Sequence, residues 1–294
     1  MDINYELYRV FYYVATTLSF SEASKRLFIS QSAVSQSIKS LEKKLEQQLF
    51  FRSTKKVHLT PEGEILLRHI EPALNLIKRG ETQLMDLNST GGQLHIGASD
   101  TICRYFLVPY LNRFHKEFPN VHIKVTNQTS LKCVELLETR QVDLIVTNFP
   151  NAALMNSSFL KVKRFQDVFI ANQTFTNLKN HKVSLEELLN YPILMLDNKS
   201  TTSEFLHDLF LQHQLDLVPS AELSSNDLLI DLARIGLGIA FVPDFCLPEN
   251  ESELFTISLA KELPFRELIV AYNDHTALTT STLTFLKYFE TLET

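Results

Sequence analysis

Residues 20–46 constrain this chain most, because their pattern predicts two helices joined by a tight turn. The first helix, Ser21–Leu27, begins on a serine that can cap it, and Ser30 can cap the second, Gln31–Glu46. Apolar side chains recur every three or four residues along the second helix, which predicts one buried face. These positions are Ala33, Val34, Ile38, Leu41 and Leu45. A short helix beside a longer, polar-faced helix is typical of the helix-turn-helix, whose second helix enters the major groove of DNA.

The other face of the second helix carries side chains that can hydrogen-bond base edges or phosphates. We predict DNA contacts there from Ser30, Gln31, Ser32, Ser35, Gln36 and Lys39. An ordinary helical pair with a solvated face would show the same spacing, so the spacing alone leaves both interpretations open.

A second DNA contact is predicted from the stretch RSTKKVHL, residues 52–59, which is typical of the two-stranded wing of a winged helix. Arg52, Lys55 and Lys56 should contact backbone phosphates, which position a protein on DNA without reading sequence. A solvated turn is the alternative for the two lysines. The apolar run Leu49–Phe51 is expected to close the small core.

Three motifs resemble the N-terminus of LysR-type transcriptional regulators: SFSEASKRLFISQSAVSQSI (residues 19–38), LEKKLEQQLFFR (residues 41–52) and LTPEG (residues 59–63). The resemblance implies a bacterial, cytoplasmic, sequence-specific regulator with a winged helix-turn-helix in residues 1–60. Ser24, Ser32 and Gln36 depart from the family's usual residues. Because Gln36 replaces a common arginine on the predicted reading face, the operator cannot be taken from relatives, and the direction of regulation also stays open.

The net charge of -6 would at first oppose DNA binding, but the charge is unevenly distributed. Residues 19–60 hold 8 lysines and arginines against 3 acids, so the acidic excess lies in the rest of the chain. Phosphate attraction is local, since salt screens charges beyond about 10 Å. A basic head on an acidic body is therefore compatible with DNA binding.

Residues 61–88 predict one long helix, which Thr60 can cap and Pro61 can begin. Its apolar positions are Leu66, Ile70, Ala73, Ile77, Leu84 and Leu87. This stripe is longer than a head of residues 1–60 needs, so we expect the helix to pair with its copy in a homodimer. Packing on its own head is the alternative. The family resemblance further implies a homotetramer and contact with RNA polymerase.

Residues 89–92 predict a linker, and residues 93–294 an α/β body. Alternating strands and helices, including a helix over Thr101–Phe118, predict parallel sheets covered by helices. The motifs DLIVTN (residues 143–148) and GLGIAFVPDF (residues 236–245) resemble the two-lobed, periplasmic-binding-protein-like effector domain of the same family. Lobe one would span residues 93–164 and 266–294, and lobe two residues 165–265.

Ligands of open parallel sheets bind beyond the carboxyl ends of the strands, against helix N-termini. This rule predicts an effector site formed by Ser99, Asp100, Thr101, Gln128, Thr129, Ser130, Thr147, Lys199, Ser200, Thr201, Thr202, Asn226 and Phe245. Hydroxyls and free N–H groups from both lobes could hold a small organic acid, with Lys199 adding positive charge and Asp100 pairing with an amine. The alternative is that these Ser, Thr and Asn residues merely cap helices.

An enzyme on the α/β body is the main competing function. The chain contains no GxGxxG, GxxxxGK[ST] or GxSxG motif and no metal-ligand spacing, so we predict no catalytic residue, no metal and no cofactor beyond a small-molecule effector. Cys103, Cys133 and Cys246 lack CxxC spacing, so an oxidation sensor is a weaker alternative. No apolar run is long enough to span a membrane and no secretory signal is apparent, so we expect neither membrane insertion nor a secreted solute receptor.

Overall fold

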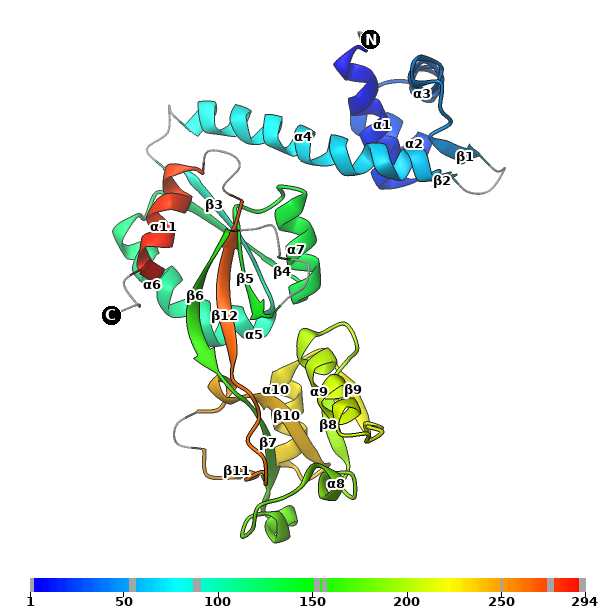
Figure 1. Cartoon of the computed structure of the whole chain (residues 1–294). Helices are drawn as coiled ribbons and strands as arrows, with labels where there is room; N and C mark the ends of the chain where they lie inside the picture. Colours follow the sequence, from blue (N-terminus) through cyan, green and yellow to red (C-terminus); the bar gives the residue numbers. More distant parts are fainter. Residues whose placement is uncertain are drawn as a thin grey trace. The chain divides into compact units, whose positions relative to one another are not determined.

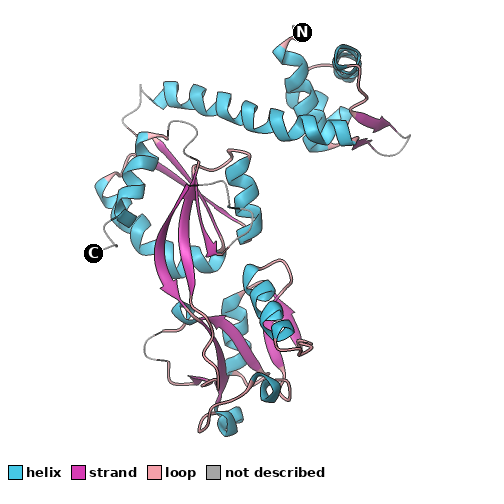
Figure 2. Ribbon diagram, in the orientation of Figure 1, coloured by secondary structure: helices cyan, strands magenta, loops and turns pink. Residues whose placement is uncertain are grey.

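A computed structural model describes residues 3–52, 57–86, 91–150, 154, 158–248, 251–273 and 278–290. The chain divides into two compact units, one of Met1–Met85 with Thr139–Gln141 and one of Asp86–Glu138 with Val142–Thr294. The first unit is helical with a short two-stranded ribbon, and the second is built on two five-stranded sheets (Figure 1, Figure 2). The predicted fold class, a winged helix-turn-helix with a long helix and a two-lobed α/β body, is confirmed.

The first unit begins with the predicted pair of helices joined by a tight turn. Its elements are α1 (Tyr5–Thr17), α2 (Phe20–Leu27), α3 (Gln31–Leu45), β1 (Phe50–Arg52), β2 (Val57–Leu59) and α4 (Pro61–Asp86). Ser30 caps α3 as predicted, since its Oγ accepts the N–H of Ala33 at 3.1 Å. The cap of α2 is Ser19 and not Ser21, because α2 starts one residue earlier and Ser19 Oγ accepts the N–H of Glu22 at 3.2 Å.

One small core joins the three N-terminal helices to the ribbon. Its fully buried side chains are Val10, Phe11 and Val14 from α1, Ala23 from α2, Val34, Ile38 and Leu41 from α3, and Leu49 and Phe50 at the ribbon. The prediction that Phe51 closes this core is wrong: its side chain is 54% exposed. Successive side chains of a strand point to opposite faces, so burial of Phe50 turns Phe51 outward. Glu42 fixes the turn into β1, because its Oε1 accepts the N–H of Leu49 at 3.0 Å.

Helix α4 packs apolar side chains on the first unit's core along its first half. Leu66, Leu67 and Ile70 contact that core, whereas Leu76, Ile77 and Leu84 farther along are exposed. The helix continues through Gly80 and also through Pro72, in its interior. The apolar stripe therefore extends beyond the part that its own head domain covers.

The first sheet of the second unit has the strand order β4-β3-β5-β12-β6. Its strands are β3 (Gln93–Ala98), β4 (His122–Asn127), β5 (Leu144–Phe149), β6 (Ser158–Phe165) and β12 (Arg266–Tyr272). Strands β3, β4 and β5 run parallel, but β12 runs antiparallel to both β5 and β6. The parallel arrangement predicted for the βαβαβ segment is confirmed for β3, β4 and β5. Strands β12 and β6 add an antiparallel pair at one side of the sheet, where the chain leaves it and returns to it.

The second sheet has the order β11-β7-β10-β8-β9 and is also mixed. Its strands are β7 (Asp167–Asn172), β8 (Ile193–Leu196), β9 (Ala221–Leu223), β10 (Ile239–Pro243) and β11 (Leu254–Thr256). Strand β8 is parallel to β9 and β10, whereas β7 is antiparallel to β10 and β11. The chain passes between the two sheets at Gln166, between β6 and β7, and again just before Arg266.

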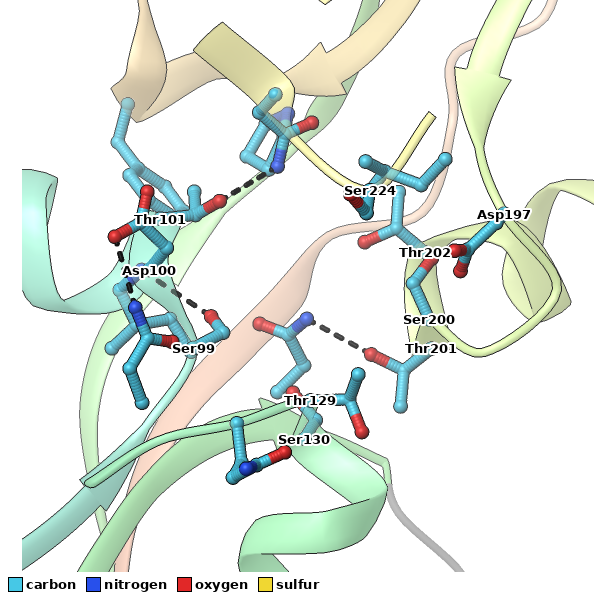
Figure 3. A pocket seen from close by; sticks show the side chains of 18 residues that line it. Ser99, Asp100, Thr101, Thr129, Ser130, Asp197, Ser200, Thr201, Thr202 and Ser224 are labelled. Carbon is cyan, nitrogen blue, oxygen red and sulfur yellow. Dashed lines mark hydrogen bonds between the residues drawn. The ribbon is translucent and has the colours of Figure 1, made fainter. Parts of the chain in front are cut away.

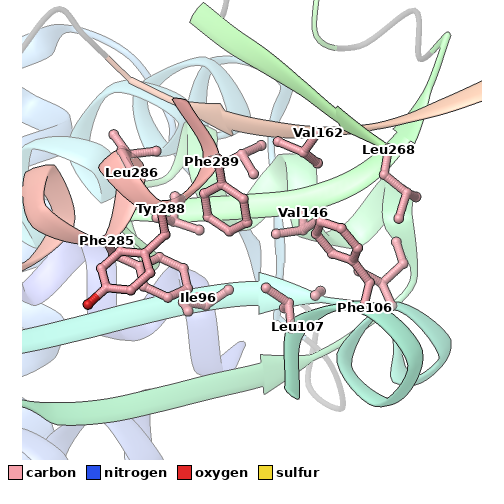
Figure 4. Packing of buried hydrophobic residues seen from close by; sticks show 14 of the residues in the cluster. Ile96, Phe106, Leu107, Val146, Val162, Leu268, Phe285, Leu286, Tyr288 and Phe289 are labelled. Atoms are coloured by element: carbon pink, nitrogen blue, oxygen red, sulfur yellow. The ribbon is translucent and has the colours of Figure 1, made fainter. Parts of the chain in front are cut away.

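Helices cover both faces of each sheet. They are α5 (Asp100–Ile102), a π-helical turn η1 (Cys103–Leu107), α6 (Val108–Glu117), α7 (Ser130–Glu138), η3 (Gln173–Leu178), α8 (Leu185–Leu188), α9 (Thr201–Gln212), α10 (Asn226–Arg234), η4 (Asp244–Cys246) and α11 (Thr280–Glu290). On the first sheet, α6 and α11 pack on one face and α7 on the other. In this core the ring of Phe289 in α11 stacks on that of Phe106, and Phe285 packs against Phe289 (Figure 4). The helix predicted over Thr101–Phe118 is interrupted by the π-helical turn.

Two glycines of α4 allow a matched test of the first unit. A Cβ at Gly63 would lie 2.3 Å from the carbonyl oxygen of Leu49, whereas a Cβ at Gly80 would meet no atom within 4 Å. We expect Gly63→Ala to lower the free energy of unfolding by about 1–3 kcal/mol, because α4 or the ribbon must shift. We expect Gly80→Ala to raise it by up to about 1 kcal/mol, because alanine favours the helix. Urea denaturation of the full chain measures both changes, and equal effects of the two substitutions would contradict the close approach.

Candidate functional site

Helix α3 separates a buried apolar face from an exposed polar one. Val34, Ile38 and Leu41 are 0% exposed, which fixes the rotation of the helix. Of the predicted DNA contacts on this helix, Ser30, Gln31, Ser32, Gln36 and Lys39 are exposed and Ser35 is half-buried. The orientation that the core imposes on α3 thus leaves its polar face available to a large partner.

The exposed side chains of α3 differ in whether they already form hydrogen bonds within the protein. Ser30 Oγ caps the helix and lies 2.9 Å from Ser32 Oγ, so both hydroxyls have local partners. Within the described residues, the side chains of Gln31, Gln36 and Lys39 make no hydrogen bond or ion pair. An amide can donate and accept at once, which suits the edge of adenine, and an ammonium suits a phosphate. These three side chains are the best candidates for new contacts.

The tip of the predicted wing, residues 53–56, lies outside the described residues. The two strands β1 and β2 pair in antiparallel fashion, with Phe50 opposite Leu59. Lys55 and Lys56 lie outside the described residues, and so does the side chain of Arg52. Their contact with phosphates therefore stays a prediction.

The second unit contains a cavity of about 200 Å³, lined by residues of both sheets. Eleven of the thirteen predicted effector-binding residues line it: Ser99, Asp100, Thr101, Gln128, Thr129, Ser130, Ser200, Thr201, Thr202, Asn226 and Phe245. Figure 3 shows these side chains converging from the ends of several strands. The rule that ligands bind at the carboxyl ends of parallel strands therefore located the cavity from the sequence.

Thr147 and Lys199 were predicted in this site, but neither lines the cavity. Strand β5 continues to Phe149, and the alternation of its side chains turns Thr147 to the opposite face from Asn148, which does line the cavity. Lys199 is exposed to solvent, and its backbone N–H donates to Asp197 Oδ1 at 3.1 Å. The positive charge expected from Lys199 is therefore not part of the cavity wall.

Three helices of nine or more residues start at the cavity wall. Ser130 begins α7, Thr201 begins α9 and Asn226 begins α10. The first backbone N–H groups of a helix have no acceptor inside it, and the helix dipole places partial positive charge there. Asp100 and Asp197 are the charged side chains in the wall, so only these N–H groups and the hydroxyls could attract an anion.

Hydrogen bonds join the two lobes across the cavity. Asn226 Nδ2 donates to Thr101 Oγ1 at 2.9 Å, and Asn148 Nδ2 donates to Thr201 Oγ1 at 3.0 Å (Figure 3). Asn226 is 5% exposed, and its Oδ1 has no hydrogen-bond partner among the described residues. The wall thus holds the lobes together and still leaves a buried polar atom without a partner.

Capping and ligand binding both find support among the predicted hydroxyls. Ser99, Thr129 and Ser200 cap helices, because their Oγ atoms accept N–H groups three residues ahead. Thr201 and Thr202 line the same cavity from the first turn of α9, and within the described part of the chain neither hydroxyl caps a backbone N–H. The capping interpretation is therefore sufficient for the first three residues only.

The sequence interpretation missed several wall residues. Asn127, Asn148, Asp197 and Ser224 all line the cavity, and each lies within one residue of the last residue of a strand. The same strand-end rule also points to these four positions, because each adjoins the carboxyl end of a strand. Asn127 is also the partner of Asp100, since its Nδ2 donates to Asp100 Oδ1 at 3.0 Å. Asp100 was predicted to pair with an amine of the ligand, but one of its carboxylate oxygens already accepts a hydrogen bond from Asn127.

A buried ion pair lies where the chain crosses between the lobes. Arg266 Nη1 donates to Asp167 Oδ2 at 2.7 Å, and the two residues are 4% and 1% exposed. Burial raises the pKa of the Asp167 carboxyl, and the neighbouring guanidinium opposes that rise. Nothing in the sequence indicated this pair, because 98 residues separate its members.

Two family models match the chain: "Bacterial regulatory helix-turn-helix protein, lysR family" over residues 5–64, and "LysR substrate binding domain" over residues 88–293. A probable RuBisCO transcriptional regulator of Phaeodactylum tricornutum (strain CCAP 1055/1) is 31% identical over 262 residues, covering 86% of this chain and 84% of the relative.

Two solved structures share the fold. Full-length CbnR complexed with its target DNA matches with a TM-score of 0.67 at 15% identity, over 98% of this chain and 99% of CbnR. The CcmR regulatory domain of Synechocystis PCC6803 in complex with 2-PG matches with a TM-score of 0.63 at 20% identity, over 69% of this chain and 98% of that domain. None of the described helices combines the length and apolarity needed to cross a bilayer.

The three cysteines allow a test of the oxidation-sensor alternative. Burial raises the pKa of Cys103 to about 11 and of Cys133 to about 12, and it raises the pKa of Cys246 as well. Because the thiolate is the reactive form, we expect all three to react slowly with a disulfide reagent at pH 8 and quickly in urea. The contribution of the buried thiols to the free energy of unfolding should be fully present below the ordinary thiol pKa of about 8.5. It should fall as the pH rises above that value, because only the thiols of the unfolded chain ionise there. A native thiol that reacts as fast as the unfolded chain would contradict this.

Proposed function

The chain belongs to the LysR family of bacterial transcriptional regulators, and we propose that it reads double-stranded DNA with α3 and responds to a small anion held between its two lobes. The observation that carries the DNA proposal is the set of exposed, unengaged polar side chains on α3. The direction of regulation does not follow from either site.

In the proposed DNA complex the N-terminal half of α3 lies in the major groove. Gln31 and Gln36 would contact base edges, and Lys39 would contact a phosphate, because the buried face of α3 leaves these side chains outward. Arg52, Lys55 and Lys56 of the wing would add phosphate contacts. The similar protein CbnR has been solved with its target DNA, which fits this arrangement of the same fold.

The proposed effector is a small organic anion, such as a carboxylate or a phosphate ester. A cavity of about 200 Å³ admits only a small molecule, and the first residues of three helices line it. The N–H groups at a helix start favour an anion. The CcmR regulatory domain, which shares this fold, was solved with 2-PG, so 2-PG is a natural first probe.

The exposed second half of α4 supports a homodimer. Leu76, Ile77 and Leu84 offer an apolar stripe that a second copy of α4 could cover. A ligand that binds one arrangement of the lobes more tightly would shift the spacing or angle of paired heads. A tetramer of two dimers, contact with RNA polymerase and a cytoplasmic location belong to the same proposal.

We propose no enzymatic activity and no cofactor beyond the effector. The cavity wall contains hydroxyls, amides and two carboxylates but no histidine or cysteine that could activate a serine or threonine. Among the described residues, no three His, Cys, Asp or Glu side chains form a cluster that could hold a metal ion.

Two substitutions on α3 should separate base reading from phosphate attraction. Gln31→Ala should cost about 1–3 kcal/mol on a preferred duplex and almost nothing on random DNA. Lys39→Ala should weaken both duplexes alike and reduce the salt slope of binding by about 1. Gel shifts on DNA upstream of the chain's own gene, with Lys116→Ala in the second unit as a charge-matched control, measure these effects. Equal losses on both duplexes for Gln31→Ala would show that α3 does not read bases there.

The effector site is testable by the thermal stability of the full chain. A carboxylate or phosphate ester such as 2-PG, present at about 100 times its Kd, should stabilise the native state by about 2.7 kcal/mol. Asn226→Asp should abolish that shift, because a carboxylate in the wall repels an anion. Asn198→Asp adds the same charge at an exposed residue outside the wall and should retain most of it. If no anion in a panel of small carboxylates and phosphates raises Tm, the effector proposal fails and the DNA proposal is untouched.

A further inference from the structure

The ion pair between Arg266 and Asp167 also contacts the cavity wall. Arg266 Nη1 lies 3.2 Å from Thr202 Oγ1, and Arg266 Nη2 lies 3.4 Å from Thr201 Oγ1. Arg266 itself does not line the cavity, and its charge is neutralised by Asp167. Its influence on a ligand must therefore pass through the two threonine hydroxyls.

The rings of Phe165 and Phe205 hold the guanidinium in place. Its central carbon lies 5.4 Å from the centroid of the first ring and 5.0 Å from that of the second. A guanidinium has five N–H donors and no acceptor. The threonine oxygens that face it can therefore only accept hydrogen bonds from it, and they cannot donate to it.

This restriction determines what the hydroxyls can offer to a ligand. A hydroxyl has one donor and two acceptor positions. Thr201 Oγ1 accepts from Arg266 and also from Asn148 Nδ2 at 3.0 Å, so both of its acceptor positions are filled. Within the described residues, no acceptor takes the O–H of Thr201 or of Thr202. Both protons are left for whatever occupies the cavity, which both residues line.

We propose that Arg266 is a positioning residue that sets the polarity of the effector site: it turns the hydroxyls of Thr201 and Thr202 into hydrogen-bond donors toward the ligand. The site then selects groups that only accept, such as the oxygens of a phosphate or carboxylate, over neutral groups that must donate. This inference rests on the proposed effector function of the cavity. It explains how an anion is preferred in a wall whose charged side chains, Asp100 and Asp197, are both acidic.

The test compares ligand affinity and stability in full-chain variants, with inorganic phosphate and 2-PG as probes. Arg266→Lys keeps the charge opposite Asp167 but lacks the planar fork, so it cannot reach both hydroxyls. We expect it to weaken binding of both anions at least roughly tenfold, as loss of a charge-assisted hydrogen bond does. Thr202→Val should weaken binding to a similar extent, whereas Thr202→Ser should bind like the native chain. Ser203→Ala removes a buried hydroxyl of the same helix that lies outside the cavity wall, and it should change the affinity less than twofold.

A double-mutant cycle separates positioning from a merely structural role. If Arg266 acts through Thr202, the double variant should bind little worse than the weaker single variant. Fully additive losses, or native affinity in Arg266→Lys, would overturn the positioning role while the effector site stands. If Arg266→Lys does not fold, the contrast between Thr202→Ser and Thr202→Val decides, and equal affinity in these two overturns the proposal. If neither anion binds the native chain, the donor polarity is overturned together with the anion-effector proposal, and DNA binding is unaffected.

Discussion

The burial of one face of α3 is the constraint on which the account of this molecule depends. Val34, Ile38 and Leu41 are fully enclosed by a core that α1, α2 and the ribbon complete. A helix that is locked on one side has a fixed opposite side, so Gln31 and Gln36 face outward at no further cost in ordering the backbone. The small core thus orients the surface proposed to contact DNA. The acidic body of the chain is compatible with this, because salt screens charges separated by more than about 10 Å.

The second unit obeys a different constraint, the direction of its strands. Parallel strands place their carboxyl ends at one edge, and the helices that follow place their N-termini there too. The cavity collects Ser130, Thr201 and Asn226 in this way, each at a helix start. The anion preference that we propose for it then needs no lysine or arginine in the wall. A buried guanidinium behind the wall, at Arg266, has its effect by orienting hydroxyls.

Local sequence patterns predicted much of this structure, whereas contacts between residues far apart in the sequence could not be predicted. Helix periodicity gave the bounds of α3 to within one residue, and the strand-end rule found most of the cavity wall. Thr147 was predicted to line the cavity, but its neighbour Asn148 does so, because the strand continues two residues beyond Thr147 to Phe149. The pairing of Arg266 with Asp167 joins strands on either side of a whole lobe. A single sequence carries no local signal for such a contact, nor for the antiparallel insertion of β12.

The central claim is that α3 reads base sequence, in a protein that pairs through α4. Selection of duplexes from a random DNA pool by the full chain tests both parts of it at once. The account predicts enrichment of a sequence with two-fold symmetry, whose half-sites lie about one helical turn or a multiple of it apart. Loss of that enrichment when Gln31 is replaced by alanine would place the reading on α3. Recovery of duplexes with no shared sequence, at affinities that depend only on salt, would contradict the account.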